Sequence, residues 1–278
     1  MASNLVVGRG GVEHVPPISL AFWRWFFVIL ILLPFTYQKI FSNIRALKKE
    51  WKKLFFLGFM GCGICGAFPF MAGVTTTVAN MGIIYTSSPI FIILISSYFY
   101  RERLSLIQFL GLALCFTGVA SIIAKGDLSL LISLKFTSGD LWMLGAAIGW
   151  ALYSVFLLNW KSRFSLFSRF TIIAFFGAIS LLPFALIENY FFRPVVFNEG
   201  FYFWTIFAAI SPGIIAFSLY AQVQKHLGAS ITGFTLYLFT VYGAFYGIVL
   251  FGETLKSYHY FGAILVFAGM FFVRKKKI

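Results

Sequence analysis

Arg24 is the one charged residue that lies well inside a long apolar segment of this 278-residue chain. It stands about seven residues into a segment that begins near residue 18, roughly 10 Å along a helix that rises 1.5 Å per residue. An arginine in the middle of a bilayer costs about 2.5–3.5 kcal/mol and needs a partner or a route to water. Its position predicts a cation that receives a carboxylate inside a cavity. The structural alternative is a side chain that reaches the surface or bonds a helix-end carbonyl.

Amide and aromatic side chains supply the other candidate binding groups. Asn4 and Gln222 lie in opposite halves of the chain, and their donors and acceptors suit a zwitterion, or else hydrogen bonds between helices. Aromatic rings can line a path for an amphipathic solute, because their faces receive cations and phenol groups bond polar ends. Aromatic side chains also fill bundles and interfacial belts, which is their alternative role. The predicted substrate-binding residues are Asn4, Arg24, Tyr85, Trp150, Tyr153, Tyr220, Gln222 and Tyr237.

Patterns for catalysis, metal binding or cofactor binding are absent from the sequence. His14, His226 and His259 are far apart, and the three cysteines lie in apolar stretches without a disulfide framework. The eight acidic residues fall in loops or near the ends of apolar segments, so no carboxylate is expected at the membrane midplane. We therefore expect no enzyme, no cofactor and no metal, and we favour facilitated diffusion or solute exchange over carboxylate-based proton coupling.

Residues 61–66 spell G-x-G-x-x-G, the pattern of a dinucleotide-binding loop. Such a loop needs a strand before it and a helix that opens at it, whereas this run lies inside an apolar segment. The glycines therefore predict close contact between helices, as do the G-x-x-x-G pairs Gly145-Gly149 and Gly243-Gly247. Pro69, just after the run, predicts a kink that forms a hinge or a cavity wall.

The composition explains why these residues must be positioned by membrane helices. The chain is 60% apolar and 11% charged, against about 45–50% and about 25% in soluble domains. The net charge of +14 sits in loops between apolar segments, which argues against nucleic-acid binding. The apolar runs do not alternate as barrel strands do, so they predict helices. The nine expected spans are 18–38, 54–74, 80–100, 104–124, 139–158, 169–189, 202–222, 231–251 and 257–273.

An internal repeat predicts two five-helix halves, 1–124 and 139–273, followed by a basic tail at 274–278. A shift of 149 lays Leu32-Leu33-Pro34-Phe35 on Leu181-Leu182-Pro183-Phe184. A shift of 151 lays Glu102 on Glu253, Leu104 on Leu255, Gly111 on Gly262 and Gly118 on Gly269. The first half lacks a counterpart of 139–149, so we expect a tenth helix represented only by its second part. A genuine nine-helix chain is the alternative.

The basic residues predict the orientation of these spans. With ten crossings and the N-terminus inside, 16 of the 22 Lys and Arg fall on the cytoplasmic side, 5 fall outside, and Arg24 lies within a span. Both termini are then cytoplasmic. Because five helices is an odd number, the second half starts on the opposite side of the membrane. This inverted repeat is typical of transporters that alternate access around a site between the halves.

Several short stretches resemble the EamA-like members of the drug/metabolite transporter superfamily. They are Ala2-Ser3-Asn4-Leu5-Val6-Val7-Gly8-Arg9, Pro16-Pro17 with Leu20-Ala21-Phe22-Trp23-Arg24-Trp25, Pro89 with Tyr100-Arg101-Glu102-Arg103-Leu104-Ser105, and Gly252-Glu253-Thr254-Leu255. Thr240 replaces the second proline of the family's pattern. The resemblance implies ten helices, an inner-membrane location and export or exchange of small metabolites, often amino acids. It also implies a central cavity, with the fifth and tenth helices peripheral.

The expected function is therefore transport of a small-molecule solute, most of all an amino acid or a related amphipathic solute, across the bacterial inner membrane. The partners are the solute and the lipid bilayer, and a homodimer is left open. The alternatives are a flippase for a lipid or a lipid-linked sugar, and a membrane sensor without transport activity.

Overall fold

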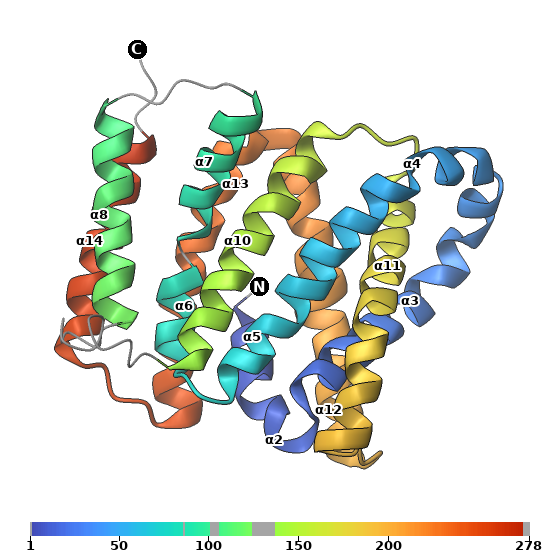
Figure 1. Ribbon diagram of the computed structural model, residues 1–278, viewed down its shortest axis with the longest axis horizontal. Helices are drawn as coiled ribbons and strands as arrows, with labels where there is room; N and C mark the ends of the chain where they lie inside the picture. Colours follow the sequence, from blue (N-terminus) through green and yellow to red (C-terminus); the bar gives the residue numbers. More distant parts are fainter. Residues whose placement is uncertain (1, 86, 101–105, 124–136, 275–278) are drawn as a thin grey trace.

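The computed structural model describes residues 2–85, 87–100, 106–123 and 137–274, and within these ranges the chain forms helices and no strand (Figure 1). The first half contains α1 (Ser3–Val6), η1 (Val7–Gly11), α2 (Val12–His14), α3 (Pro17–Phe41), α4 (Ile44–Leu57), η2 (Gly58–Ile64), α5 (Cys65–Gly73), α6 (Val78–Tyr85), α7 (Ser88–Tyr100) and α8 (Leu106–Ile123). The second half contains α10 (Ser138–Asn159), α11 (Leu166–Ile187), η3 (Glu188–Phe192), α12 (Glu199–Ala208), η4 (Ala209–Ile215), α13 (Ala216–Phe251) and α14 (Ser257–Arg274). The η segments are π-helical.

Long apolar helices make this a polytopic membrane protein. Within the described ranges, 6 helices are long and apolar enough to cross a bilayer: Pro17–Phe41, Ile44–Gly73, Val78–Phe99, Ser138–Asn159, Leu166–Phe192 and Glu199–His226. Each corresponds to one expected span. The other three expected spans, 104–124, 231–251 and 257–273, fall on α8, the later part of α13 and α14.

The expected break between residues 222 and 231 was wrong, because the backbone is helical throughout α13, from Ala216 to Phe251. Gln222-Val223-Gln224-Lys225 contains neither proline nor glycine, and glutamine and lysine favour a helix. A polar stretch of this kind marks the edge of an apolar run without ending the helix.

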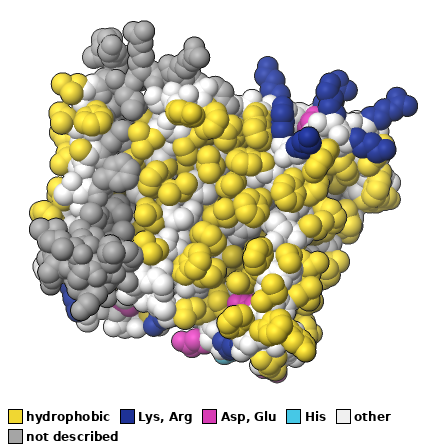
Figure 2. All heavy atoms as spheres, viewed as in Figure 1, with side chains coloured by type: hydrophobic (Ala, Val, Ile, Leu, Met, Phe, Trp, Pro, Cys, Tyr) yellow, Lys and Arg dark blue, Asp and Glu magenta, His cyan; other side chains and the backbone are white. Residues whose placement is uncertain are grey.

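The outer surface of the bundle carries large apolar side chains, as expected for helices that face lipid. Phe35 on α3, Phe184 on α11 and Phe203 on α12 are all exposed. Figure 2 shows apolar side chains over most of the visible face, with charged groups gathered at its edges. Trp25, Trp150, Phe70 and Phe201 are among the largest fully buried side chains.

Two helix pairs run antiparallel. The start of α3 meets the end of α11, because the Glu188 carboxylate accepts from the backbone N–H groups of Ile18 (3.1 Å) and Ser19 (2.6 Å). The end of α3 meets the start of α11, where Thr36 Oγ1 donates to Thr171 Oγ1 at 3.2 Å. α8 and α14 also pack together, and Cys115 Sγ lies 3.2 Å from the carbonyl oxygen of Val266.

Glycines make the α8–α14 contact close. A Cβ on Gly118 would lie 2.7 Å from the carbonyl oxygen of Gly262, and a Cβ on Gly269 would meet the carbonyl of Gly111. These two contacts exchange when each residue is replaced by its partner 151 positions away. Element bounds share this offset: 58 + 151 = 209 and 64 + 151 = 215 relate η2 to η4, and 106 + 151 = 257 and 123 + 151 = 274 relate α8 to α14.

The described bundle has two differently charged ends. One end, which we call the basic end, carries exposed cations where α3 meets α4 and α10 meets α11 (dark blue at the upper right of Figure 2). Its cations are Lys39, Arg45, Lys48, Lys49, Lys52, Lys53, Lys161 and Arg163. The opposite end, which we call the carboxylate end, contains Asp140, Glu188 and Glu253, of which Asp140 and Glu188 are buried.

Candidate functional site

Arg24 lies in the middle of the bundle, in the second turn of α3, with only 1% of its surface exposed. Its Nη1 donates to Asn4 Oδ1 at 2.7 Å, and its guanidinium lies over the rings of Trp25 (4.2 Å) and Phe70 (4.9 Å). Nε and Nη2 have no hydrogen-bond partner among the described residues. A buried cation with unused donors is costly, so these two groups are well suited to bind an anionic atom that enters the site.

A cavity of about 20 Å³ adjoins this guanidinium. Residues from both halves of the chain line it: Asn4, Arg24, Cys65, Pro69, Tyr85, Met143, Trp150, Pro212 and Phe217. A space of this size holds about one water molecule. The bundle is therefore closed around the arginine, and helices must separate before a metabolite fits. Pro69 forms part of the wall, as predicted from its position.

Trp150 is the centre of an aromatic cluster on one side of this cavity. Its ring centroid lies 4.8 Å from that of Tyr220, 5.3 Å from Tyr153, 5.4 Å from Phe217 and 6.4 Å from Tyr85. Tyr220 also shares a 3.1 Å hydrogen bond with Ser154, which fixes its hydroxyl group. These rings present π faces and phenol groups close to a cation, the combination that an amphipathic solute requires.

The structure brings together six of the eight residues predicted for the site. Asn4, Arg24, Tyr85 and Trp150 line the central cavity, and Tyr153 and Tyr220 pack against Trp150. The Gln222 side chain is exposed instead. Tyr237 lies within α13, but its side chain falls outside the described part of the structure.

Helical phase explains the position of Gln222. Residues three or four apart share a helix face, so Tyr220 and Gln224 point inward while Gln222 points away. Gln224 is 3% exposed and donates to the Ser154 carbonyl at 3.3 Å. Phe217 belongs to the same inward face, and the predictions missed it. The spacing 217, 220, 224 is the signal that identifies this face.

Glycines 61–66 pack against neighbouring helices, as predicted, and form no nucleotide loop. They span η2 and the start of α5. A Cβ on Gly63 would lie 2.9 Å from Ser180 Oγ, and a Cβ on Gly66 would lie 2.7 Å from Trp25 Nε1. These glycines allow α11 and α3 to approach closely, which places the Trp25 indole where it donates to the Cys62 carbonyl at 2.7 Å.

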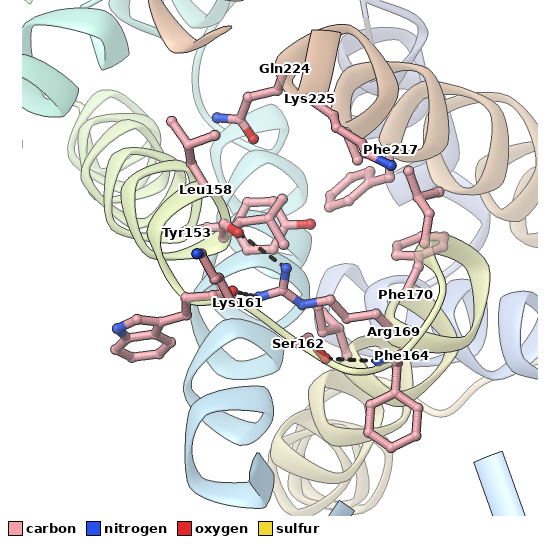
Figure 3. A pocket seen from close by; sticks show the side chains of 15 residues that line it. Tyr153, Leu158, Lys161, Ser162, Phe164, Arg169, Phe170, Phe217, Gln224 and Lys225 are labelled. Carbon is pink, nitrogen blue, oxygen red and sulfur yellow. Dashed lines mark hydrogen bonds between the residues drawn. The ribbon is translucent and has the colours of Figure 1, made fainter. Parts of the chain in front are cut away.

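A second, larger cavity of about 340 Å³ lies at the basic end (Figure 3). It is lined by the end of α10, the segment that follows it, the start of α11 and one face of α13. Figure 3 shows the Arg169 guanidinium in the cavity near Tyr153 and Lys161, with Lys225 and Gln224 on the α13 side. The sequence analysis placed these cations in loops and did not predict this cavity.

Phe217 lines both cavities and forms the partition between them. Its ring lies 5.2 Å from Trp25, 5.4 Å from Trp150 and 5.5 Å from Phe170, against which it stacks. A change in the position of this one ring would connect the basic-end cavity with the Arg24 site. The arrangement is that of a route closed by an aromatic side chain.

At the carboxylate end, three carboxylates of the second half bond groups of the first half. Glu188 accepts from Ile18 N, Ser19 N and Ser19 Oγ. Glu253 accepts from Val78 N (2.8 Å) and Ala79 N (3.1 Å). Asp140 accepts from the Thr76 hydroxyl group. Two of the three acids thus bind the N-terminal N–H groups of helices α3 and α6, where negative charge is stabilised.

Comparison with known proteins agrees with this architecture. The family model described as "EamA-like transporter family" matches residues 1–124 and 137–275. An "Uncharacterized transporter" of Archaeoglobus fulgidus is 26% identical, over 99% of this chain and 94% of the relative. The Bacillus subtilis "Uncharacterized transporter YetK" is 25% identical, over 100% of this chain and 84% of the relative.

Two further similarities concern a named activity and a fold. A Salmonella typhimurium protein named "Probable amino-acid metabolite efflux pump" is 25% identical, over 96% of this chain and 89% of the relative. A solved crystal structure superposes with a TM-score of 0.62, over 98% of this chain and 91% of the other, at 17% identity. The second similarity is one of fold.

Proposed function

We propose, because the chain belongs to the EamA-like transporter family, that it carries small amphipathic metabolites, amino acids above all, across the inner membrane by export or exchange. The name of the Salmonella relative supports amino acids as the first class to test. The observation that carries the proposal is Arg24, a buried cation with two unused donors beside an aromatic cluster. An amino acid has a carboxylate for the guanidinium and, in its larger members, an apolar body for the rings.

The proposed mechanism is alternating access by two inverted five-helix halves, 1–124 and 139–273. The antiparallel packing of α3 on α11 and of α8 on α14 supports this relation, since the repeat pairs α3 with α11 and α8 with α14. The shared offset of 151 and the two ranges of the family match support it as well. Opposite halves that exchange conformations turn an opening at one membrane face into an opening at the other.

The proposed orientation places the basic end and both termini in the cytoplasm. Lys and Arg in short loops mark the cytoplasmic side of a membrane protein, and the exposed cations gather where α3 meets α4 and α10 meets α11. Solute from the cytoplasm would then enter at the basic end, pass Phe217 and bind at Arg24. It would leave when the carboxylate end opens.

Counterflow in proteoliposomes tests this function. The purified chain would be reconstituted with unlabelled amino acid inside and a panel of labelled amino acids outside, with and without a pH gradient. We expect uptake of at least one amino acid, and exchange that persists without the gradient. A folded protein that exchanges none of the panel would overturn the amino-acid assignment.

The Arg24→Gln variant tests the site. Loss of a buried charge that pairs with a carboxylate typically costs 2–5 kcal/mol, so we expect transport of carboxylate solutes to fall by at least about tenfold. The matched control is Arg163→Gln, because the Arg163 side chain is exposed at the basic end. Unchanged carboxylate transport by a folded Arg24→Gln protein would remove Arg24 from the site.

A further inference from the structure

We infer that the cavity at the basic end is a second binding site, which takes an organic anion with an apolar body before that anion reaches Arg24. The inference rests on the proposed solute route and adds to it a site and a ligand class. The 15 residues that line the cavity include three cations, Lys161, Arg169 and Lys225, and no acid. A low-dielectric hollow with charges of one sign raises the local concentration of the opposite ion.

Arg169 is the fixed charge of this site. Its Nη1 donates to the Leu157 carbonyl at 3.1 Å and its Nη2 to the Trp160 carbonyl at 2.8 Å. Both partners are neutral, so they orient the guanidinium without neutralising it. Nε is buried and has no hydrogen-bond partner in the described part of the chain.

The nearby acid is bound elsewhere. Glu50 on α4 accepts from Ser162 Oγ at 2.6 Å and from the backbone N–H of Arg163 at 3.3 Å. It therefore holds the segment between α10 and α11 in place, and it is not among the lining residues. Lys161 and Lys225 add two flexible charges, one on each side of the cavity, which can close on an anion from opposite directions.

The rest of the lining determines the ligand class. Leu157, Phe170 and Phe217 provide an apolar wall, and Gln224 and Tyr153 provide polar groups deeper inside. The volume of about 340 Å³ falls in the range of small-molecule pockets. An aromatic or branched monocarboxylate has the required charge, size and apolar surface. A compact inorganic anion would leave the apolar wall bare.

A purely structural role accounts for only part of this arrangement. Arg169 binds carbonyls at the end of α10, as arginines often do at helix C-termini. That role does not require the two lysines that line the same cavity, nor an unfilled volume next to the Arg24 site. Phe217, shared by both cavities, places the second site directly on the proposed route.

Fluorine NMR with 4-fluorophenylacetate tests the inference on the full chain in detergent micelles. We expect the wild-type protein to broaden the fluorine line, less so at high salt, and to bind the neutral 4-fluorophenylacetamide much more weakly. The double variant Lys161→Gln/Lys225→Gln should raise the Kd by about tenfold, from two partly exposed charge interactions. The matched control is Lys48→Gln/Lys52→Gln, which removes two exposed charges from α4 at the same end.

The Arg24→Gln variant separates the two sites, since it should keep this binding while it loses carboxylate transport. Three results would overturn the inference: equal binding by the cavity double variant and the wild type, equal binding of acid and amide, or loss of binding in Arg24→Gln. If the acid does not bind but proteoliposomes still exchange amino acids, the second site is disproved and the proposed function stands.

Discussion

The two ends of the molecule are built differently, although the same helices run between them. At the carboxylate end, Asp140, Glu188 and Glu253 of the second half bond hydroxyl and N–H groups of the first half. At the basic end, a cavity of about 340 Å³ opens between α10, α11 and α13. The central Arg24 site is thus cut off from one end by direct bonds between the halves, and from the other mainly by the Phe217 partition.

The contrast indicates which contacts must change during transport. A carboxylate that binds the N-terminal N–H groups of a neighbouring helix makes charge-assisted bonds, yet both partners can return to water when the helices separate. Such contacts can close an end firmly and still release it. The aromatic partition needs only a change of side-chain position, and such changes are faster and smaller than helix movement.

Glu188→Ala is expected to have the largest effect, because it breaks the carboxylate end where it is most buried. The substitution removes three hydrogen bonds and leaves the N–H groups of Ile18 and Ser19 without their acceptor. Hydrogen bonds to charged groups contribute about 1.5–3 kcal/mol each, and they are not additive, so we expect about 3 kcal/mol less stability. Unfolding in SDS mixed micelles, followed by tryptophan fluorescence, measures it.

The control for Glu188→Ala is Glu13→Ala, since Glu13 is an exposed acid at the same end. An exposed substitution of this kind changes stability by less than about 0.5 kcal/mol. Equal losses in the two variants would mean that the acids at this end act only through their charge, and the difference between the ends would lose its basis.

Thiol labelling compares the two ends directly. Ala221 lines the basic-end cavity, whereas Ala79 is 2% exposed and its N–H donates to Glu253. Cysteines 62, 65 and 115 are buried, so the unmodified chain provides the background. We expect Ala221→Cys to react with a charged methanethiosulfonate at least about tenfold faster than Ala79→Cys, because a protected thiol reacts only after local opening. The reverse order would place the open end at Glu253.

Much of this arrangement could be predicted from the sequence, for physical reasons that particular residues illustrate. Apolar runs long enough to cross a bilayer predict helices, and α3, α10 and α11 lie close to the expected positions. A lone charge in such a run needs a polar partner, and Arg24 bonds Asn4, the other polar candidate in the first half. Both predictions depend on local composition and on the cost of burying charge.

What could not be predicted depends on how the helices are rotated and packed. Gln222 and Gln224 have the same chemistry, and only the rotation of α13 decides which of them is buried. Phe217 is one of 37 phenylalanines, so its residue type carries no signal. The basic-end cavity needs Lys161, Arg169 and Lys225 from three separate segments, which only the folded bundle brings together.

Phe217→Leu is expected to sharpen the contrast at the basic end by weakening the partition. Leucine keeps the apolar character but loses the ring contacts with Trp25, Trp150 and Phe170. If displacement of this ring limits exchange, a loss of about 0.7 kcal/mol from the barrier speeds counterflow about threefold. The control is Phe203→Leu on the exposed face of α12. An unchanged or slower rate would show that the ring does not limit access.

Thr36→Val is expected to have the smallest effect, and it tests how firmly the halves are bonded at the basic end. Thr36 Oγ1 donates to Thr171 Oγ1 on α11, and it also lies 2.8 Å from the Leu32 carbonyl of its own helix. Hydrogen bonds between membrane helices average about 0.6 kcal/mol, so we expect a loss of that order in the same SDS unfolding measurement. The control is Thr117→Val, whose hydroxyl group donates to the Ala113 carbonyl within α8. A loss as large as that of Glu188→Ala would mean that α3 and α11 are held equally at both ends, and opening would then need another cause than the weakness of the basic end.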